Sequence, residues 1–168
     1  MIVGTNCYSS GDFFEKYKLE DIEVGSYTQI GRDVKFFNQP DHKSIYNPSQ
    51  VNNYPPQMIG GQPALKSSRG KLIIGSDVWV GDEAVLFGGV RIGNGVIVGA
   101  YSVVAKDIPP YAVVVGNPAK ITRFRFSEDQ IASLERIKWW EWDEKDIVKT
   151  SGIMENIDEF IKKYEVAR

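Results

Sequence analysis

The chain has 168 residues, of which 42% are hydrophobic, and its formal net charge is −2. This length suits one domain, alone or with an appendage, and the small net charge argues against broad attraction to nucleic acid or to a membrane surface. A single cysteine, Cys7, excludes an intramolecular disulfide and fits a reducing compartment. Neither a secretory leader nor a membrane-spanning stretch is visible, so a cytoplasmic location is expected.

The first 21 residues are rich in aromatic side chains and lack a regular period. They are expected to form an atypical first coil that covers one end of the repeat structure that follows, because terminal repeats must hide an open face. Cys7 lies in this segment. A lone cysteine with no histidine near it in the sequence is expected to pack against other side chains rather than to act as a nucleophile.

A six-residue repeat begins at Ile22, is interrupted, and resumes at Leu72. A large apolar residue recurs at every sixth position in each part, and glycine often follows it. These residues are Val24, Ile30 and Phe36, and then Ile74, Val80, Leu86, Ile92, Val98 and Val104. A hexapeptide period is typical of a parallel β-helix, in which each unit forms one short strand and one corner. An ordinary sheet protein with regular turns would not keep one fixed spacing, so we predict a β-helix with the recurring side chains inside.

The interruption, residues 37–71, is rich in Pro, Asn, Gly, Gln and Ser. It is too long for an ordinary connection, and long loops in compact domains are usually either functional or disordered. It contains His42, the only histidine of the chain, between Asp41 and Lys43. From this context alone, His42 is either a functional group or an exposed histidine without a role.

Three cations follow the last repeat and a Gly116-Asn117-Pro118 turn. The cations are Lys120, Arg123 and Arg125. They form either a solvated basic patch or a phosphate site, because compact cations suit phosphate oxygens. Before the turn, residues 113–115 are expected to form a last buried strand.

The remainder is predicted to be helical. Ser127 and Gln130 form a capping box at the start of a first helix, Asp143 caps a short second helix that runs through residue 148, and residues 153–164 mark a third. Tryptophans 139, 140 and 142 are expected to seal this tail against the β-helix rather than to stack on a base or a sugar. The predicted units are therefore a β-helix at 1–125, with the loop 37–71 inserted, and a helical tail at 126–168.

The run IIGSDVWVGDEAVLFGGVRIGNGVIVGAYSVVAKDIPPYAVVVGNPAKI resembles the hexapeptide-repeat acetyltransferases. The tail FRFSEDQIASLERIKWWEW, together with the histidine of the loop, is similar to their xenobiotic branch, which includes type B chloramphenicol and streptogramin acetyltransferases. The resemblance implies a left-handed parallel β-helix that assembles as a homotrimer. It also implies acetyl-CoA bound between subunits, with the extended loop of one subunit helping to form the acceptor site.

The resemblance implies an O-acetyltransferase that uses acetyl-CoA as co-substrate, without a metal. A hydroxyl group is too weak an acid to ionise at neutral pH, so a base must take its proton, and histidine has a suitable pKa of ~6.5. His42 matches the catalytic histidine of the family. Asp41 stands where relatives usually have asparagine, and a neighbouring carboxylate favours the protonated form of an imidazole.

Other site residues carry over from matching motifs. The resemblance places seven residues near acetyl-CoA: Trp79, Asp82, Ala100, Ala105, Lys106, Lys120 and Arg123. For Trp79 an equal alternative is a surface aromatic of the coil that is buried by packing within a trimer. Three further residues, Tyr8, Asp41 and Tyr46, are proposed contacts of the acceptor.

The acceptor stays open between an antibiotic and a sugar of a surface polysaccharide or a nucleotide sugar, and an amino sugar acetylated on nitrogen is a third possibility. A zinc carbonic anhydrase on this fold needs three histidines and is excluded by the single histidine. A purely structural β-helix would not bind coenzyme A.

Overall fold

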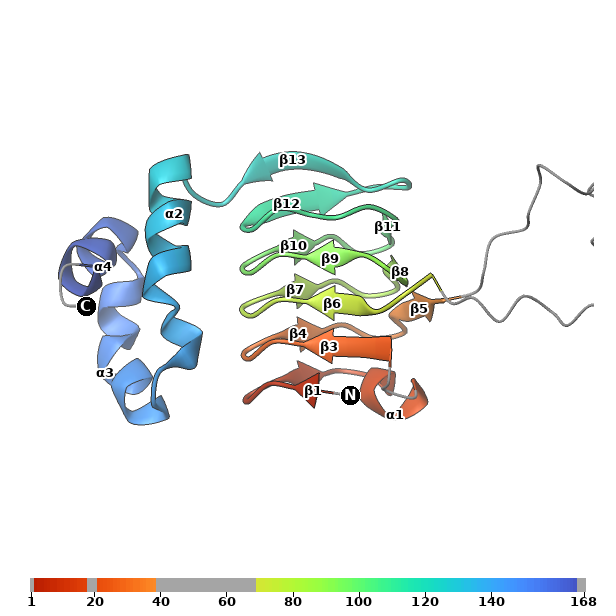
Figure 1. Ribbon diagram of the computed structural model, residues 1–168, viewed down its shortest axis with the longest axis horizontal. Helices are drawn as coiled ribbons and strands as arrows, with labels where there is room; N and C mark the ends of the chain where they lie inside the picture. Colours follow the sequence, from red (N-terminus) through yellow and green to blue (C-terminus); the bar gives the residue numbers. More distant parts are fainter. Residues whose placement is uncertain (1, 18–20, 39–68, 166–168) are drawn as a thin grey trace, which may run out of the picture.

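The computed structural model describes residues 2–17, 21–38 and 69–165, in which short strands stack into three sheets beside a group of helices (Figure 1). The first sheet contains β1(Ile2–Val3), β3(Ile22–Val24), β6(Leu72–Ile74) and β9(Arg91–Ile92). The second contains β2(Tyr8–Ser9), β4(Gln29–Ile30), β7(Trp79–Val80), β10(Ile97–Val98), β12(Ala112–Val115) and β13(Lys120–Phe124). The third contains β5(Lys35–Phe37), β8(Val85–Phe87) and β11(Val103–Val104). All pairs are parallel except β12 with β13.

The chain visits the first, second and third sheets in turn and then returns to the first. Ile74 therefore pairs with Ile92, and Val80 pairs with Val98, each 18 residues further along the chain. Three hexapeptides thus form one coil of a parallel β-helix, which confirms the prediction from the period. The interruption does not change the register, because Val24 pairs with Ile74 as though the coil were continuous.

The recurring side chains form the core. Ile74, Val80, Leu86, Ile92, Val98 and Val104 are all buried, as are the residues two positions before each of them.

A column of polar side chains lies along one corner of the stack. Ser26 Oγ accepts a hydrogen bond from the Thr5 N–H, Ser76 Oγ from the Ser26 N–H, and Asn94 Oδ1 from the Ser76 N–H, at 2.8–3.2 Å. Backbone donors that point along the stack are satisfied in this way.

The N-terminal segment closes one end of the stack, as predicted. The helix α1(Phe13–Lys16) places Phe13, which is buried, against the core. Cys7 is half-buried and packs on the same core; its thiol donates a hydrogen bond to the Gly25 carbonyl at 2.9 Å, and burial raises the pKa of this thiol. The expectation of a packing role for Cys7 is confirmed.

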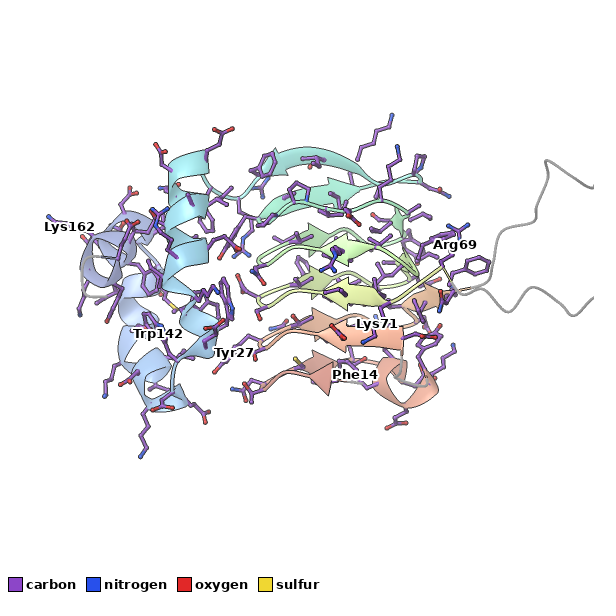
Figure 2. The ribbon with its side chains drawn as sticks, in the orientation of Figure 1. Phe14, Tyr27, Arg69, Lys71, Trp142 and Lys162 are labelled. Atoms are coloured by element: carbon purple, nitrogen blue, oxygen red, sulfur yellow. The ribbon has the colours of Figure 1, made fainter. Side chains whose placement is uncertain are left out.

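The tail consists of α2(Glu128–Ile137), the short 3-10 helix η4(Trp139–Glu141), α3(Glu144–Met154) and α4(Ile157–Tyr164). It lies beside the β-helix, and Figure 2 shows Trp142 of the tail and Arg69 on opposite sides of the stacked strands. The capping box of Ser127 is present, and the three tail tryptophans pack in a second apolar cluster, as predicted. Among the described helices, none has the length and apolar character needed to cross a membrane.

Two details of the sequence prediction are wrong. Val115 is exposed rather than buried, because successive residues of β12 point to opposite faces and, of the three valines, only Val114 enters the core. Ile153 belongs to α3, which continues to Met154, rather than to the third helix. Asp143 precedes α3 as its N-cap residue but makes no side-chain capping hydrogen bond.

Candidate functional site

The outer face of the second sheet brings three predicted site residues into one column. The register aligns Tyr8, Gln29, Trp79, Ile97, Val113 and Arg123 across six strands. Tyr8 and Trp79 are 63% and 56% exposed, because alternate residues of each strand point away from the core. With strands ~4.8 Å apart, Trp79 lies about 10 Å from Tyr8 and about 14 Å from Arg123.

Asp82 and Ala100 meet at the corner between the second and third sheets. Asp82 Oδ1 accepts a hydrogen bond from the Arg32 N–H at 2.9 Å, and Oδ2 pairs with the Arg32 guanidinium at 3.1 Å. These hydrogen bonds hold the pKa of the Asp82 carboxyl below its usual range. The Asp82 carboxylate is therefore engaged within the corner itself, whereas Ala100, one coil further on, is exposed.

Tyr101 is an exposed aromatic that the sequence analysis did not single out. Its side chain is 68% exposed beside Ala100, and its hydroxyl donates a hydrogen bond to Glu83 Oε1 at 3.1 Å. This bond raises the pKa of Tyr101. Its φ of 59° is unusual for a residue other than glycine, and such residues concentrate at functional sites. The sequence signal that could have identified Tyr101 is its position within the hexapeptide. Asp77 and Glu83 occupy the same position in earlier repeats and have similar φ angles.

The Gly116–Pro118 turn packs on the end of the stack. Gly116 O accepts from the Val103 N–H at 2.9 Å, and the Ala119 N–H donates to Val103 O at 2.9 Å. These two hydrogen bonds hold the segment before Lys120 against β11, and Ala105 and Lys106 directly follow β11 in the chain. All three of these predicted cofactor residues are exposed.

Arg125 does not share the environment of the two other predicted cations. Its Nη1 donates to Asp77 Oδ2 at 2.9 Å and to the Gly95 carbonyl at 2.8 Å, and its side chain is 26% exposed. Lys120 and Arg123, on β13, are exposed and make no ion pair with a described residue. Of the three cations, only Lys120 and Arg123 therefore remain candidates for a phosphate site. Arg125 instead binds the corners of the β-helix, at the point where the helical tail begins.

Asn38 joins the two ends of the inserted segment. Its Oδ1 accepts from the Arg69 N–H at 2.9 Å, and its Nδ2 donates to Asp21 Oδ2 at 3.1 Å. Sequence reasoning missed Asn38, because its partners are distant in the chain. The predicted catalytic residue His42 and the predicted acceptor contacts Asp41 and Tyr46 lie outside the described residues.

The repeats and the tail together match known proteins. A family model described as "Bacterial transferase hexapeptide (six repeats)" matches residues 71–106. A chloramphenicol acetyltransferase of Agrobacterium fabrum (strain C58 / ATCC 33970) is 33% identical over 162 residues, which cover 84% of this chain and 76% of that protein. The chain belongs to the hexapeptide-repeat acetyltransferases, in their xenobiotic branch.

Two further relatives support the assignment of this chain to the family. A chloramphenicol acetyltransferase of Escherichia coli is 37% identical over 130 residues, covering 74% of this chain and 61% of the relative. A probable macrolide acetyltransferase of Lysinibacillus sphaericus is 32% identical over 152 residues, covering 84% and 82%. The chain spans about six tenths of the length of the E. coli protein.

Two solved structures are similar to this chain in fold. A maltose O-acetyltransferase from Clostridium difficile 630 superposes with a TM-score of 0.55 at 30% identity, covering 74% of this chain and 59% of that one. A hexapeptide-repeat acetyltransferase from Vibrio cholerae O1 biovar eltor, complexed with acetyl coenzyme A, gives a TM-score of 0.50 at 22% identity, covering 74% and 71%. At that identity, the second likeness concerns the fold alone.

Proposed function

We propose that this protein is an acetyl-CoA-dependent O-acetyltransferase that acts on a hydroxyl group of a small molecule. The observation that carries the proposal is the 33% identity to a chloramphenicol acetyltransferase, because it extends over 84% of the chain and includes both the repeats and the tail. A similarity confined to the hexapeptide repeats would support the fold but would not support the acetyltransferase activity.

His42 is the proposed general base. As the acceptor oxygen attacks the thioester carbonyl of acetyl-CoA, the imidazole takes the hydroxyl proton, so that no free alkoxide has to form. The tetrahedral intermediate then collapses, the carbon–sulfur bond breaks, and the leaving thiolate receives that proton. The products are an acetyl ester and coenzyme A, and the neutral imidazole is regenerated.

The described residues offer places for the two ends of acetyl-CoA. Lys120 and Arg123 are exposed cations on one strand and suit the phosphates of the adenosine end. The backbone at Ala100 and the segment with Ala105 and Lys106 would line the pantetheine arm. Trp79 would wall the thioester end. We propose a supporting role for Asp82, because its carboxylate is already engaged by Arg32.

The second sheet is the proposed contact surface between subunits. Its outer face exposes three large apolar side chains from β2, β7 and β12, namely Tyr8, Trp79 and Val115. Patches of this kind mark interaction sites. We propose a left-handed coil and a homotrimer in which each acceptor site lies between subunits, with Tyr8, Asp41 and Tyr46 contacting the acceptor.

The acceptor class is proposed from the relatives. They include a chloramphenicol acetyltransferase, a probable macrolide acetyltransferase and a maltose O-acetyltransferase, so antibiotics and sugars are both represented. The shared chemistry is a hydroxyl group on a polar, ring-containing molecule.

The test is release of free thiol from acetyl-CoA across chloramphenicol, a streptogramin A, a macrolide, free sugars and nucleotide sugars. His42→Ala should keep acetyl-CoA binding and the oligomer while losing more than about 100-fold in turnover. Lys43→Ala, a change at the adjacent residue, is the control and should retain turnover. Near wild-type activity in His42→Ala would show that His42 is not the base. A chain that binds no acetyl-CoA would refute the whole proposal.

A further inference from the structure

A cavity of about 260 Å³ lies between the β-helix and the helical tail. Its walls come from both units: Asp77, Tyr111 and Arg125 on one side, and Leu134, Trp139 and Phe160 from the tail. Figure 1 shows α2 next to the corners of the coils. A cavity of 150 Å³ already accepts benzene, so this one has room for a single substituted ring.

One polar group in this wall lacks a partner. Tyr111 is 1% exposed, and its buried hydroxyl makes no hydrogen bond with any described residue. Burial and the nearby carboxylates of Asp77 and Glu135 raise the pKa of Tyr111 far above its usual range, so the hydroxyl keeps its proton. A buried hydroxyl without a partner is costly, and native proteins usually satisfy it with water or a ligand.

The charged groups around the cavity already have hydrogen-bond partners. Arg125 is bound by Asp77 and the Gly95 carbonyl, and both oxygens of Glu135 accept hydrogen bonds from Asn94 Nδ2 at 3.1 Å. An anionic ligand would face two carboxylates, and a cationic ligand would face the guanidinium. A neutral molecule avoids both penalties and leaves the Tyr111 hydroxyl as the group to be satisfied.

We infer that this cavity is a binding site for a small neutral aromatic molecule that carries one hydroxyl group. Its ring lies among the apolar residues of the tail, and its hydroxyl pairs with the hydroxyl of Tyr111. The site lies on the tail side of the molecule and uses none of the residues assigned to acetyl transfer.

The test uses the full chain and 4-bromophenol, with bromobenzene as the matched probe that lacks the hydroxyl. Calorimetric titration should show saturable binding of one 4-bromophenol per chain, and the anomalous signal of bromine in soaked crystals should lie in the cavity. Tyr111→Phe removes only the hydroxyl and should weaken 4-bromophenol about fivefold, the equivalent of one neutral hydrogen bond, while bromobenzene binding stays unchanged.

Filling the cavity provides an independent test. Leu134→Trp and Met154→Phe add bulk from two different helices, so at least one folded variant should be obtained, and binding of both probes should disappear in it. Absence of saturable binding, bromine located elsewhere, or unchanged 4-bromophenol affinity in Tyr111→Phe would each overturn the inference.

Discussion

Replacing Arg125 with methionine should loosen the tail from the β-helix. The substitution removes the ion pair with Asp77 and the hydrogen bond to the Gly95 carbonyl, while methionine keeps an apolar stem of similar length. The guanidinium also lies over the rings of Tyr111 and Phe126, at 5.6 Å and 5.3 Å from their centroids, and these contacts are lost as well.

The size of the effect follows from the partial burial of the pair. The Arg125 and Asp77 side chains are 26% and 27% exposed, so the loss lies below the 3–5 kcal/mol of a fully buried pair. We expect Arg125→Met to reduce the free energy of unfolding by about 2–3 kcal/mol at pH 7. Asp77→Asn combined with Arg125→Met leaves no unpaired charge and should cost only about 1 kcal/mol.

The loss should depend on pH with a defined sign. Burial raises the pKa of the Asp77 carboxyl, and Arg125 opposes that rise. Without Arg125 the pKa rises further, so the folded variant holds a proton that the unfolded chain has released. Stability then increases as pH falls, and the difference between Arg125→Met and the wild type should shrink between pH 7 and pH 5.

The assay is urea unfolding followed by tryptophan fluorescence, which reports on the three tryptophans of the tail, at one fixed protein concentration. Arg123→Met, two residues earlier on β13 and exposed, is the matched control and should change stability by less than about 0.5 kcal/mol. An Arg125→Met loss no greater than that of the control, or one that grows as pH falls, would refute the reasoning.

Three further predictions concern the core, a corner and the cofactor. Leu86→Ala should cost about 3 kcal/mol in urea unfolding, because Leu86 is fully buried, whereas its outward neighbour Val85→Ala should cost less than about 1. Gly95→Ala should destabilise by more than Gly116→Ala: both have positive φ, but only at Gly95 would a Cβ overlap a buried aromatic ring, so equal midpoints would contradict the packing argument. Arg123→Ala should raise KM for acetyl-CoA about fivefold and leave KM for the acceptor unchanged, and equal rises in both would point to general damage.

Much of the fold could be predicted because the signal is local. Each hexapeptide contains its own strand and corner, so the spacing of Ile74, Val80 and Leu86 determines which side chains enter the core without knowledge of distant residues. The capping box at Ser127 is local for the same reason. The predicted strand before Gly116 needed correction at Val115, because a run of three valines does not show in the sequence which of its members face the core.

The candidate site was predictable only in part. Trp79, Ala100 and Arg123 were identified through motifs, and their exposed positions are compatible with the proposed roles. The motif could not show that Tyr8 shares a column with Trp79, because that depends on the register across three strands of the stack. The role of His42 stays a prediction.

The sequence by itself determined the repeat and the family, because these are properties of neighbouring residues along the chain. The register across the interruption came from the structure, in which Val24 pairs with Ile74. Only the tertiary structure decided that Arg125 joins Asp77, 48 residues away, and that Tyr111 is buried with an unsatisfied hydroxyl. Ion pairs and cavities depend on which surfaces meet when the tail docks. Composition and spacing do not encode the distance between two such surfaces, so these features become visible only in the folded chain.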